Sequence, residues 1–383
     1  MGSLIHSKVA ICQSAIQPGG RLQVILGMID VLNEMGIEPD VLTFNLALRP
    51  SELERIYGKS PRARFQVLPH VRLPHEYSIV LFNAVLNLIA HRYQLLINTS
   101  NSLIFLPPKE KILSYVFYPR ESRIKADVYS IHNPENTIEP YSPEFFSRML
   151  LRSIYKASKL QSAHYLVSMT EFTRTALEDV YPLKLNTLPV IYPPVAIEAF
   201  QHANREKLEM TITSIGRFTP DKRQLEQIRL AQQMQSFDFY IVGFVSSQKY
   251  YEECEALVKE LNLSNVHLCP NAPFEEMSQI LQKSKYFLHA LVNEPFGITA
   301  VQAIAAGCMP IVHDSGGQRE VVPYEQLRFR EMGEVSSLIE NLENLDRVSF
   351  ESLQLELQQQ AVKRFGDAVF REKINRVLSD LLA

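Results

Sequence analysis

Short apolar runs alternate with helical patterns along most of this chain of 383 residues. In the first half, a buried-strand pattern at Val9–Cys12 is followed by a helical pattern at Leu22–Glu34. In the second half the alternation resumes at Met210–Ile215. This order is typical of parallel sheets covered by helices, so we expect an α/β fold. The other expected strands are 40–44, 95–97, 112–117, 164–167, 190–192, 237–242, 265–268, 286–289 and 309–312, and the other expected helices are 79–90, 143–159, 171–180, 250–261, 274–282, 298–306 and 361–382.

A break in this alternation divides the chain into two halves. Tyr192-Pro-Pro-Val195 interrupts the pattern, and the polar stretch 201–207 resembles a linker. We expect Rossmann-like domains at residues 1–197 and 208–362, followed by an amphipathic helix at 363–383. Two such domains are expected to face a central cleft, because parallel sheets bind ligands at the carboxyl ends of their strands.

Composition excludes several classes of protein. The net charge is −3 and nothing global favours nucleic-acid binding, so we expect no such partner. The four cysteines form no C-x-x-C pair, which argues against a zinc or redox site, and we expect free thiols and no metal. The start of the chain lacks a signal-peptide core, and the apolar run 79–90 is too short for a bilayer. We therefore expect a cytoplasmic protein.

Two cations follow the first strand of the second half. Arg217 and Lys222 lie after Gly216, in a loop that leads to a helix. The start of a helix favours anions, and Arg and Lys both bind phosphate oxygens. Taken alone, such a pair would more often be two solvated surface cations. Together with the acidic segment downstream, it predicts a diphosphate site.

The acidic segment runs from Glu294 to Pro310 and contains a glycine turn, a helix of small residues and a Gly-x-x-Pro stop. Gly297 permits close approach of a ligand to the backbone, and the amides of Phe296, Gly297 and Ile298 are expected to be exposed. Glu294 can accept hydrogen bonds from sugar hydroxyls, and Gln302 lies on the helix that follows. The segment thus predicts a site for a polyol beside the diphosphate.

These motifs resemble the family-4 retaining glycosyltransferases of the GT-B fold. The family pattern E-P-F-G-x-x-x-x-E-A-x-A-x-G-x-P resembles the segment from Glu294, in which Gln302 stands at the second Glu, and its phosphate-binding Arg and Lys match Arg217 and Lys222. Three more segments resemble mannosyltransferases that build lipid-linked oligosaccharides. They are Tyr115–Pro119, Ser168–Thr173 and Val190–Val195.

The resemblance implies further roles. Gly19 and Gly20 match the glycine loop that lies at the donor sugar and phosphates, and Gly316 and Gly317 match the Gly-Gly segment near the sugar. Residues 1–197 would bind the acceptor and 208–362 the nucleotide sugar, while the last helix crosses back to the first domain. No cofactor is implied, because the nucleoside-diphosphate sugar is the donor substrate.

This chain departs from the family at two positions. Gln302 replaces the second glutamate, which binds the nucleotide ribose, and Phe117 stands where the lipid-linked mannosyltransferases often carry a histidine. An amide can still bond a ribose hydroxyl, although without the charge. His132 is a candidate substitute for the missing histidine.

A basic stripe suggests a second partner. Arg148, Arg152, Lys156 and Lys159 share one expected helix face, with Arg120, Arg123 and Lys125 near in sequence. The stripe fits either a solvated helix face or a surface for an anionic acceptor or lipid headgroup. Peripheral contact with the cytoplasmic membrane face therefore stays open.

The combined reading is a metal-independent, retaining hexosyltransferase. Glu294 would orient the donor sugar, while Arg217 and Lys222 stabilise the departing diphosphate. GDP-mannose is the favoured donor, and the acceptor is a glycan, a lipid-linked glycan or a small molecule. Two alternatives remain: a catalytically weak nucleotide-sugar-binding subunit, and a GT-B nucleotide-sugar epimerase.

Overall fold

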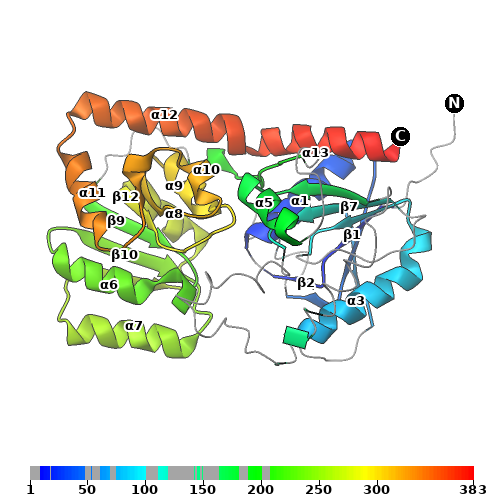
Figure 1. Ribbon diagram of the computed structural model, residues 1–383, viewed down its shortest axis with the longest axis horizontal. Helices are drawn as coiled ribbons and strands as arrows, with labels where there is room; N and C mark the ends of the chain where they lie inside the picture. Colours follow the sequence, from blue (N-terminus) through cyan, green and yellow to red (C-terminus); the bar gives the residue numbers. More distant parts are fainter. Residues whose placement is uncertain are drawn as a thin grey trace. The chain divides into compact units, whose positions relative to one another are not determined.

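The described part of the chain forms two compact units (Figure 1). The first contains the described residues up to Pro194 together with Asp367–Ala383, and the second contains Val195–Gly366. The computed structural model describes residues 9–17, 19–47, 53, 61–69, 75–100, 111–119, 142, 145–146, 149, 164–180, 189–200 and 208–383.

The first unit is built on a parallel sheet of six strands. Their order across the sheet is β5-β3-β1-β6-β7-β8. The central strands are buried along their length, as expected for a parallel sheet that is covered on both faces. The strands are β1 (Val9–Cys12), β3 (Asp40–Thr43), β5 (Arg64–Val67), β6 (Leu95–Asn98), β7 (Lys111–Val116) and β8 (His164–Ser168), and β2 (Ala15–Ile16) pairs with β4 (Asn45–Leu46) beside them.

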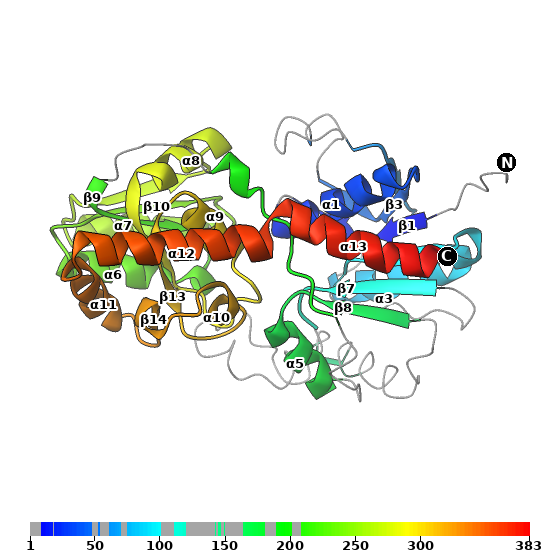
Figure 2. The same ribbon diagram turned by 90° about the horizontal axis from the view of Figure 1, so that it is seen from above.

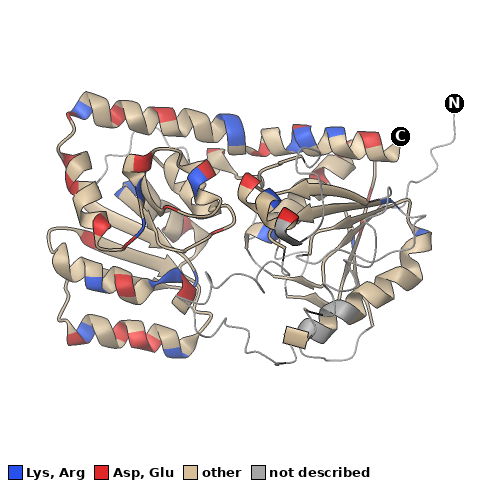
Figure 3. Cartoon of the chain, in the orientation of Figure 1, with Lys and Arg blue, Asp and Glu red and all other residues tan. Residues whose placement is uncertain are grey.

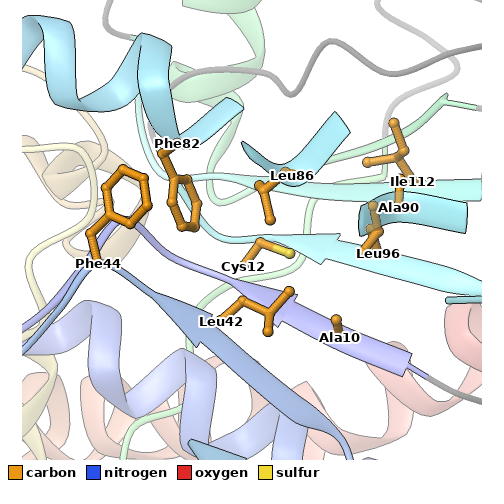
Figure 4. Close-up of a cluster of buried hydrophobic side chains, with 9 residues drawn as sticks. All are labelled: Ala10, Cys12, Leu42, Phe44, Phe82, Leu86, Ala90, Leu96 and Ile112. Carbon is orange, nitrogen blue, oxygen red and sulfur yellow. The ribbon is translucent and has the colours of Figure 1, made fainter. Parts of the chain in front are cut away.

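Helices α3 (His75–Ile89) and α1 (Gly20–Glu34) pack on this unit's core. Figure 4 shows α3 residues Phe82 and Leu86 pointing toward side chains of the strands below them, Cys12 and Leu42 among them. Because successive strand residues face opposite sides of a sheet, Ala10 and Cys12 belong to this cluster while Val9 and Ile11 face away from it. Helix α5 (Glu171–Val180) follows β8, and α13 (Asp367–Leu382) packs on α1.

The second unit repeats this plan with its own parallel sheet of six strands. The order across the sheet is β11-β10-β9-β12-β13-β14. In Figure 3 the strands are largely uncharged, while acidic and basic residues concentrate on helices and loops. The strands are β9 (Leu208–Ile215), β10 (Asp238–Gly243), β11 (Val266–Pro270), β12 (Ser284–His289), β13 (Met309–His313) and β14 (Arg328–Phe329).

Helices cover both faces of this second sheet. Figure 1 shows α6 and α7 on one face and α8 and α9 on the other. Helix α9 is rich in alanine and buried along its length, which allows close packing against β12 and β13. Figure 2 shows the long α12 lying across α9. The helices are α6 (Gln224–Gln233), α7 (Gln248–Glu260), α8 (Phe274–Lys283), α9 (Ile298–Ala305), α10 (Gln318–Val321), α11 (Glu334–Glu343) and α12 (Arg347–Phe365).

Both sheets have the same doubly wound strand order. If the six strands of each sheet are numbered by their order in the chain, their order across the sheet is 3-2-1-4-5-6. In sheets of this kind the connections reverse direction between the first and fourth strands, and ligands bind beyond the carboxyl ends there. The expected α/β fold with two parallel-sheet domains is confirmed, and each unit has one such switch point, at β1 and β6 or at β9 and β12.

Two local expectations are wrong. Val190–Tyr192 is not a strand, because Val190 forms only an isolated bridge to Ser168. Prolines at 189, 193 and 194 remove backbone donors on both sides of it. The helix expected at 361–382 is broken at Gly366, whose extended ψ of 152° ends α12 before α13 begins.

The sequence patterns also missed short elements. Strand β5 is mostly exposed and begins with Arg64, so it carries no apolar run. Strand β14 has two residues only. Among the helices of the described residues, none is both long enough and apolar enough to cross a membrane.

Candidate active site

Lys222 and Glu294 meet at the switch point of the second sheet. Lys222 follows β9 in a short 3-10 turn at Pro220–Lys222, and Glu294 follows β12. The Lys222 ammonium lies 3.0 Å from Glu294 Oε2, and both side chains are about four-fifths buried. Two residues 72 positions apart thus form one ion pair at the position where α/β sheets bind ligands.

The loop after β9 is fixed by contacts that orient Lys222. Arg223 adopts a left-handed conformation with φ 57°, forms a two-pronged ion pair with Glu226 and donates to the carbonyl of Ala290 at 3.3 Å. Gln227 donates to the Lys222 carbonyl at 2.9 Å. The loops after β9 and β12 are therefore tied together behind the ion pair.

Gly216 leaves the space that the Lys222 side chain occupies. A Cβ at Gly216 would lie 3.2 Å from Lys222 Cδ, which is tighter than ordinary contact. Gly243 on the neighbouring strand is more constrained still, because its Cβ would clash with the Gly216 carbonyl. The glycine predicted at the phosphate loop thus has a packing reason of its own.

The Glu294 carboxylate is held ionised by its neighbours. Burial raises its pKa, but the Lys222 charge, the nearby His289 and a hydrogen bond from the Phe296 amide together lower it below the ordinary 4.5. His289 Nε2 lies 3.8 Å from the same oxygen, Oε2. Burial, followed by the Lys222 charge, lowers the pKa of His289 to about 4. At neutral pH the site therefore contains a carboxylate, an ammonium and an uncharged imidazole.

Helix α9 begins beside this ion pair. Its N-cap, Gly297, has φ 98°, a conformation that favours glycine. Within the described residues, the amides of Gly297 and Ile298 have no hydrogen-bond partner. The start of an α-helix attracts anions through such amides and its dipole.

The Ser315–Gly317 segment packs directly on the loop that carries Glu294. The Gly317 amide donates to the Glu294 carbonyl at 2.8 Å, and Ser315 Oγ accepts from the Asn293 amide at 2.7 Å. A Cβ at Gly316 would lie 2.4 Å from that Glu294 carbonyl, and one at Gly317 would lie 2.0 Å from the Pro295 carbonyl. These two glycines therefore allow two loops to approach backbone to backbone.

The remaining predicted residues of this unit differ in their exposure to solvent. Arg217 is exposed on the loop after β9, and its carbonyl accepts from Gln224 at 2.8 Å. Gln302 is buried on α9, with 7% of its surface exposed. The Phe296 ring is buried against Phe365 of α12, with ring centroids 5.3 Å apart, and its amide donates to Glu294, so the expected exposed amide at Phe296 is wrong.

Gly19 and Gly20 belong to the first unit, at the start of α1. Gly19 is the N-cap and has φ 136° and ψ −175°, a region that only glycine enters readily. Phe117 follows β7 in the same unit and is buried beside Tyr115, and the Arg21 guanidinium lies 5.1 Å from its ring centre. The expected basic stripe and His132 lie outside the described residues, as do Arg120, Arg123 and Lys125.

Several residues of the site were not predicted from the sequence. Arg223 and His289 have no motif of their own, and Gln318 donates from α10 to the Leu291 carbonyl at 2.7 Å. The spacing of Arg223 and Glu226 is a helical ion-pair signal that could have identified one of them. His289 could have been singled out only as a polar residue at the end of a buried strand.

Comparison with known proteins finds a family match within the second unit. Residues 196–350 match the family described as "Glycosyl transferases group 1". A "GDP-Man:Man(3)GlcNAc(2)-PP-Dol alpha-1,2-mannosyltransferase" of Xenopus laevis is 31% identical over 155 residues, which is 36% of this chain and 32% of that protein. The protein of the same description in Dictyostelium discoideum is 24% identical over 304 residues, 71% of this chain and 59% of that protein. The chain thus spans from about a third to three-fifths of these relatives.

Solved structures share the whole fold. Sucrose-phosphate synthase from Thermosynechococcus elongatus superposes with a TM-score of 0.76 at 15% identity, covering 98% of this chain and 99% of that one. Anabaena Alr3699/HepE in complex with UDP and glucose gives 0.72 at 17% identity, covering 98% and 100%. These structures confirm the GT-B fold, and the family match and the mannosyltransferase relatives confirm the predicted resemblance.

Proposed function

We propose that this chain, whose residues 196–350 form a glycosyl transferases group 1 domain, is a retaining glycosyltransferase that uses GDP-mannose. The observation that carries the proposal is the buried Lys222–Glu294 ion pair at the switch point, beside the open amides that begin α9. Such a site offers positive charge for a diphosphate and a carboxylate for sugar hydroxyls. The choice of GDP-mannose rests on the relatives in Xenopus laevis and Dictyostelium discoideum, whose names give GDP-Man as the donor.

The chemistry follows from these groups. The bond between the sugar's anomeric carbon and the diphosphate breaks, and the acceptor oxygen bonds that carbon on the same face. Lys222 and Arg217 stabilise the charge that grows on the leaving diphosphate, an electrostatic role that is strongest for groups already in place. The acceptor proton passes to the leaving phosphate. Glu294 holds the donor sugar through its hydroxyls.

We assign the acceptor to the glycan class, with lipid-linked glycans favoured by the names of the same relatives. Soluble glycans of the same sugar sequence are the other acceptors to test. A chain that uses both equally recognises the sugar, and one that needs the lipid recognises a membrane-bound substrate. Contact with a membrane surface belongs to this proposal only in the second case.

The test is transfer of radiolabelled mannose from GDP-mannose to a lipid-linked mannosyl-chitobiose glycan, with UDP-glucose as a competing donor. We expect transfer from GDP-mannose, and proton NMR of the product should show the α-anomer of the donor retained. Because two protein cations serve the diphosphate, the rate should not fall when a chelator is added. Binding of GDP without turnover would favour a nucleotide-binding subunit, and product formation without acceptor would favour an epimerase.

Glu294→Gln tests the sugar role of the carboxylate. The amide keeps the shape but loses the charge-assisted bonds to hydroxyls, so turnover should fall by about 10²-fold while GDP affinity changes little. The measurement pairs initial rates with GDP titration by calorimetry. An unchanged rate would remove Glu294 from the mechanism.

A further inference from the structure

His289 lies behind the ion pair and has no role in the mechanism above. It is the last residue of β12, 4% of its surface is exposed, and its Nε2 atom lies 3.8 Å from Glu294 Oε2. Its other ring nitrogen, Nδ1, is buried without a hydrogen-bond partner among the described residues. Burying a titratable ring without a hydrogen-bond partner at such a place costs free energy of folding.

One carboxylate oxygen serves two neighbours of unequal strength. Glu294 Oε2 accepts from Lys222 at 3.0 Å, while His289 stands 0.8 Å further away (3.8 − 3.0). In the proposed reaction Lys222 has a second duty, because its ammonium must also meet the donor's diphosphate. When Lys222 contacts the diphosphate, its ion pair with Glu294 weakens, and the carboxylate then lies near an anionic ligand.

The uncharged form of His289 fits the vacated place. If the proton were on Nδ1, the bare Nε2 lone pair would face the carboxylate and repel it. With the proton on Nε2, the imidazole can donate to Glu294 after a small approach, and Nδ1 is left as an unfilled acceptor. His313 is the other nearby histidine, and it is occupied by Ser315 Oγ at 2.8 Å.

We infer that His289 is a positioning residue that holds the Glu294 carboxylate toward the donor sugar when Lys222 turns to the diphosphate. The inference rests on the proposed function and deepens it. His289 acts through Glu294 and does not touch the reacting atoms. This role requires the uncharged ring. A protonated His289 would pair with Glu294 in the free protein and compete with Lys222, whereas the uncharged ring donates to Glu294 only after Lys222 has moved to the diphosphate.

Paired substitutions test this role in the full chain. His289→Gln keeps an N–H donor near the position of Nε2, whereas His289→Phe keeps a flat ring without one. We expect His289→Phe to lower kcat with GDP-mannose by about 10-fold or more while the GDP dissociation constant stays within about twofold. His289→Gln should retain kcat within about threefold. His267→Phe, on the exposed side of β11, is the matched control and should leave both values unchanged.

Two results would overturn the inference. One is a His289→Phe variant with the wild-type kcat. The other is an equal loss in the Phe and Gln variants that follows their loss of thermal stability, which is what a packing role alone produces.

A measurement without turnover separates this inference from the proposed function. Nitrogen-15 NMR of histidine-labelled protein at pH 7 should show His289 protonated at Nε2, and its signal should move when GDP is added. A proton on Nδ1 in the free protein overturns the inference whether or not any nucleotide binds. If no donor is turned over, the transferase proposal fails and the positioning inference falls with it, whereas a proton on Nδ1 in a protein that does turn over donor overturns the positioning inference alone.

Discussion

At the scale of single residues, the site is defined by how one carboxylate is shared. Glu294 is kept ionised against its burial chiefly by the Lys222 charge, with the Phe296 amide as a further donor. The same ion pair neutralises the charge of Lys222 in the free protein. A diphosphate ligand would therefore compete with Glu294 for the Lys222 charge.

Lys222→Ala should lower turnover strongly. The loss of a preorganised cation at a developing charge costs about 10²–10³-fold in kcat. Lys249→Ala on α7, where the lysine is exposed, is the control and should leave the rate unchanged. Steady-state kinetics with the working donor provide the measurement. Equal rates in the two variants would show that Lys222 does not stabilise the leaving group.

His289 makes the protein sensitive to mild acid. Its pKa is about 4 in the folded chain against an ordinary 6.5, so between these values the unfolded chain binds a proton that the folded chain does not. As far as His289 affects it, the free energy of unfolding is therefore highest above pH 6.5 and falls as the pH is lowered toward 4. The Glu294 contribution is lost only in a lower window, below the ordinary 4.5 of a glutamate.

Urea unfolding of wild type and His289→Gln at pH 7.5 and pH 5 measures this effect. The wild type should lose more free energy of unfolding between the two pH values than the variant does. A loss of the same size in both proteins would place the acid sensitivity elsewhere.

At the scale of elements, two loops define the site by packing on each other. The strand ends bring Lys222 and Glu294 together, but the Ser315–Gly317 segment fixes the backbone from which Glu294 projects. The glycines there are required by close contact between backbones.

Gly317→Ala should therefore damage both stability and activity. The new Cβ would meet the Pro295 carbonyl at 2.0 Å and push the Glu294 loop away. Overpacking of this kind costs about 1–3 kcal/mol, and activity should fall further than stability does. Gly333→Ala is the control, since nothing lies within 4 Å of its Cβ position. Thermal melts and initial rates of both variants decide the matter, and a Gly317→Ala protein with wild-type behaviour would show that the loop can move freely.

Much of the arrangement of elements could be predicted from the sequence, and the failures have local causes. Parallel strands such as β1 and β6 are buried along their length, and their sequences are short, mostly apolar runs. Strand β5 carries no such run, and the prolines around Val190 turned an apolar run into an extended connection. Lys222 and Glu294 were each identified from a motif, but their ion pair was not predicted, and His289 and Arg223 depend on contacts between loops that no local pattern records.

At the scale of the whole molecule, the two units have the same sheet topology, but the first unit is built from separate segments of the chain. The first unit is completed by α13, which lies after the entire second unit in the sequence. Phe370 of α13 packs on Tyr115 of the first unit and lies close to Gly27 of α1. Phe365, only five positions earlier, packs on Phe296 of the second unit.

Two neighbouring phenylalanines should therefore destabilise different units. Truncation of a buried phenylalanine to alanine costs about 3–5 kcal/mol. In hydrogen exchange read by mass spectrometry, Phe370→Ala should raise exchange in β1 and β7, and Phe365→Ala should raise it in α9 and β12. The same exchange pattern in both variants would mean that the units unfold as one.

The late position of α13 also has a consequence for biosynthesis. The second unit has its full set of strands and helices as soon as Gly366 has left the ribosome, whereas the first unit, although synthesised earlier, still lacks the helix that covers α1. During translation the apolar surface of α1 must wait uncovered while some 170 further residues are added. A premature stop within α12 should therefore leave α1 of the amino-terminal half without its covering helix, although the altered codon lies in the other half.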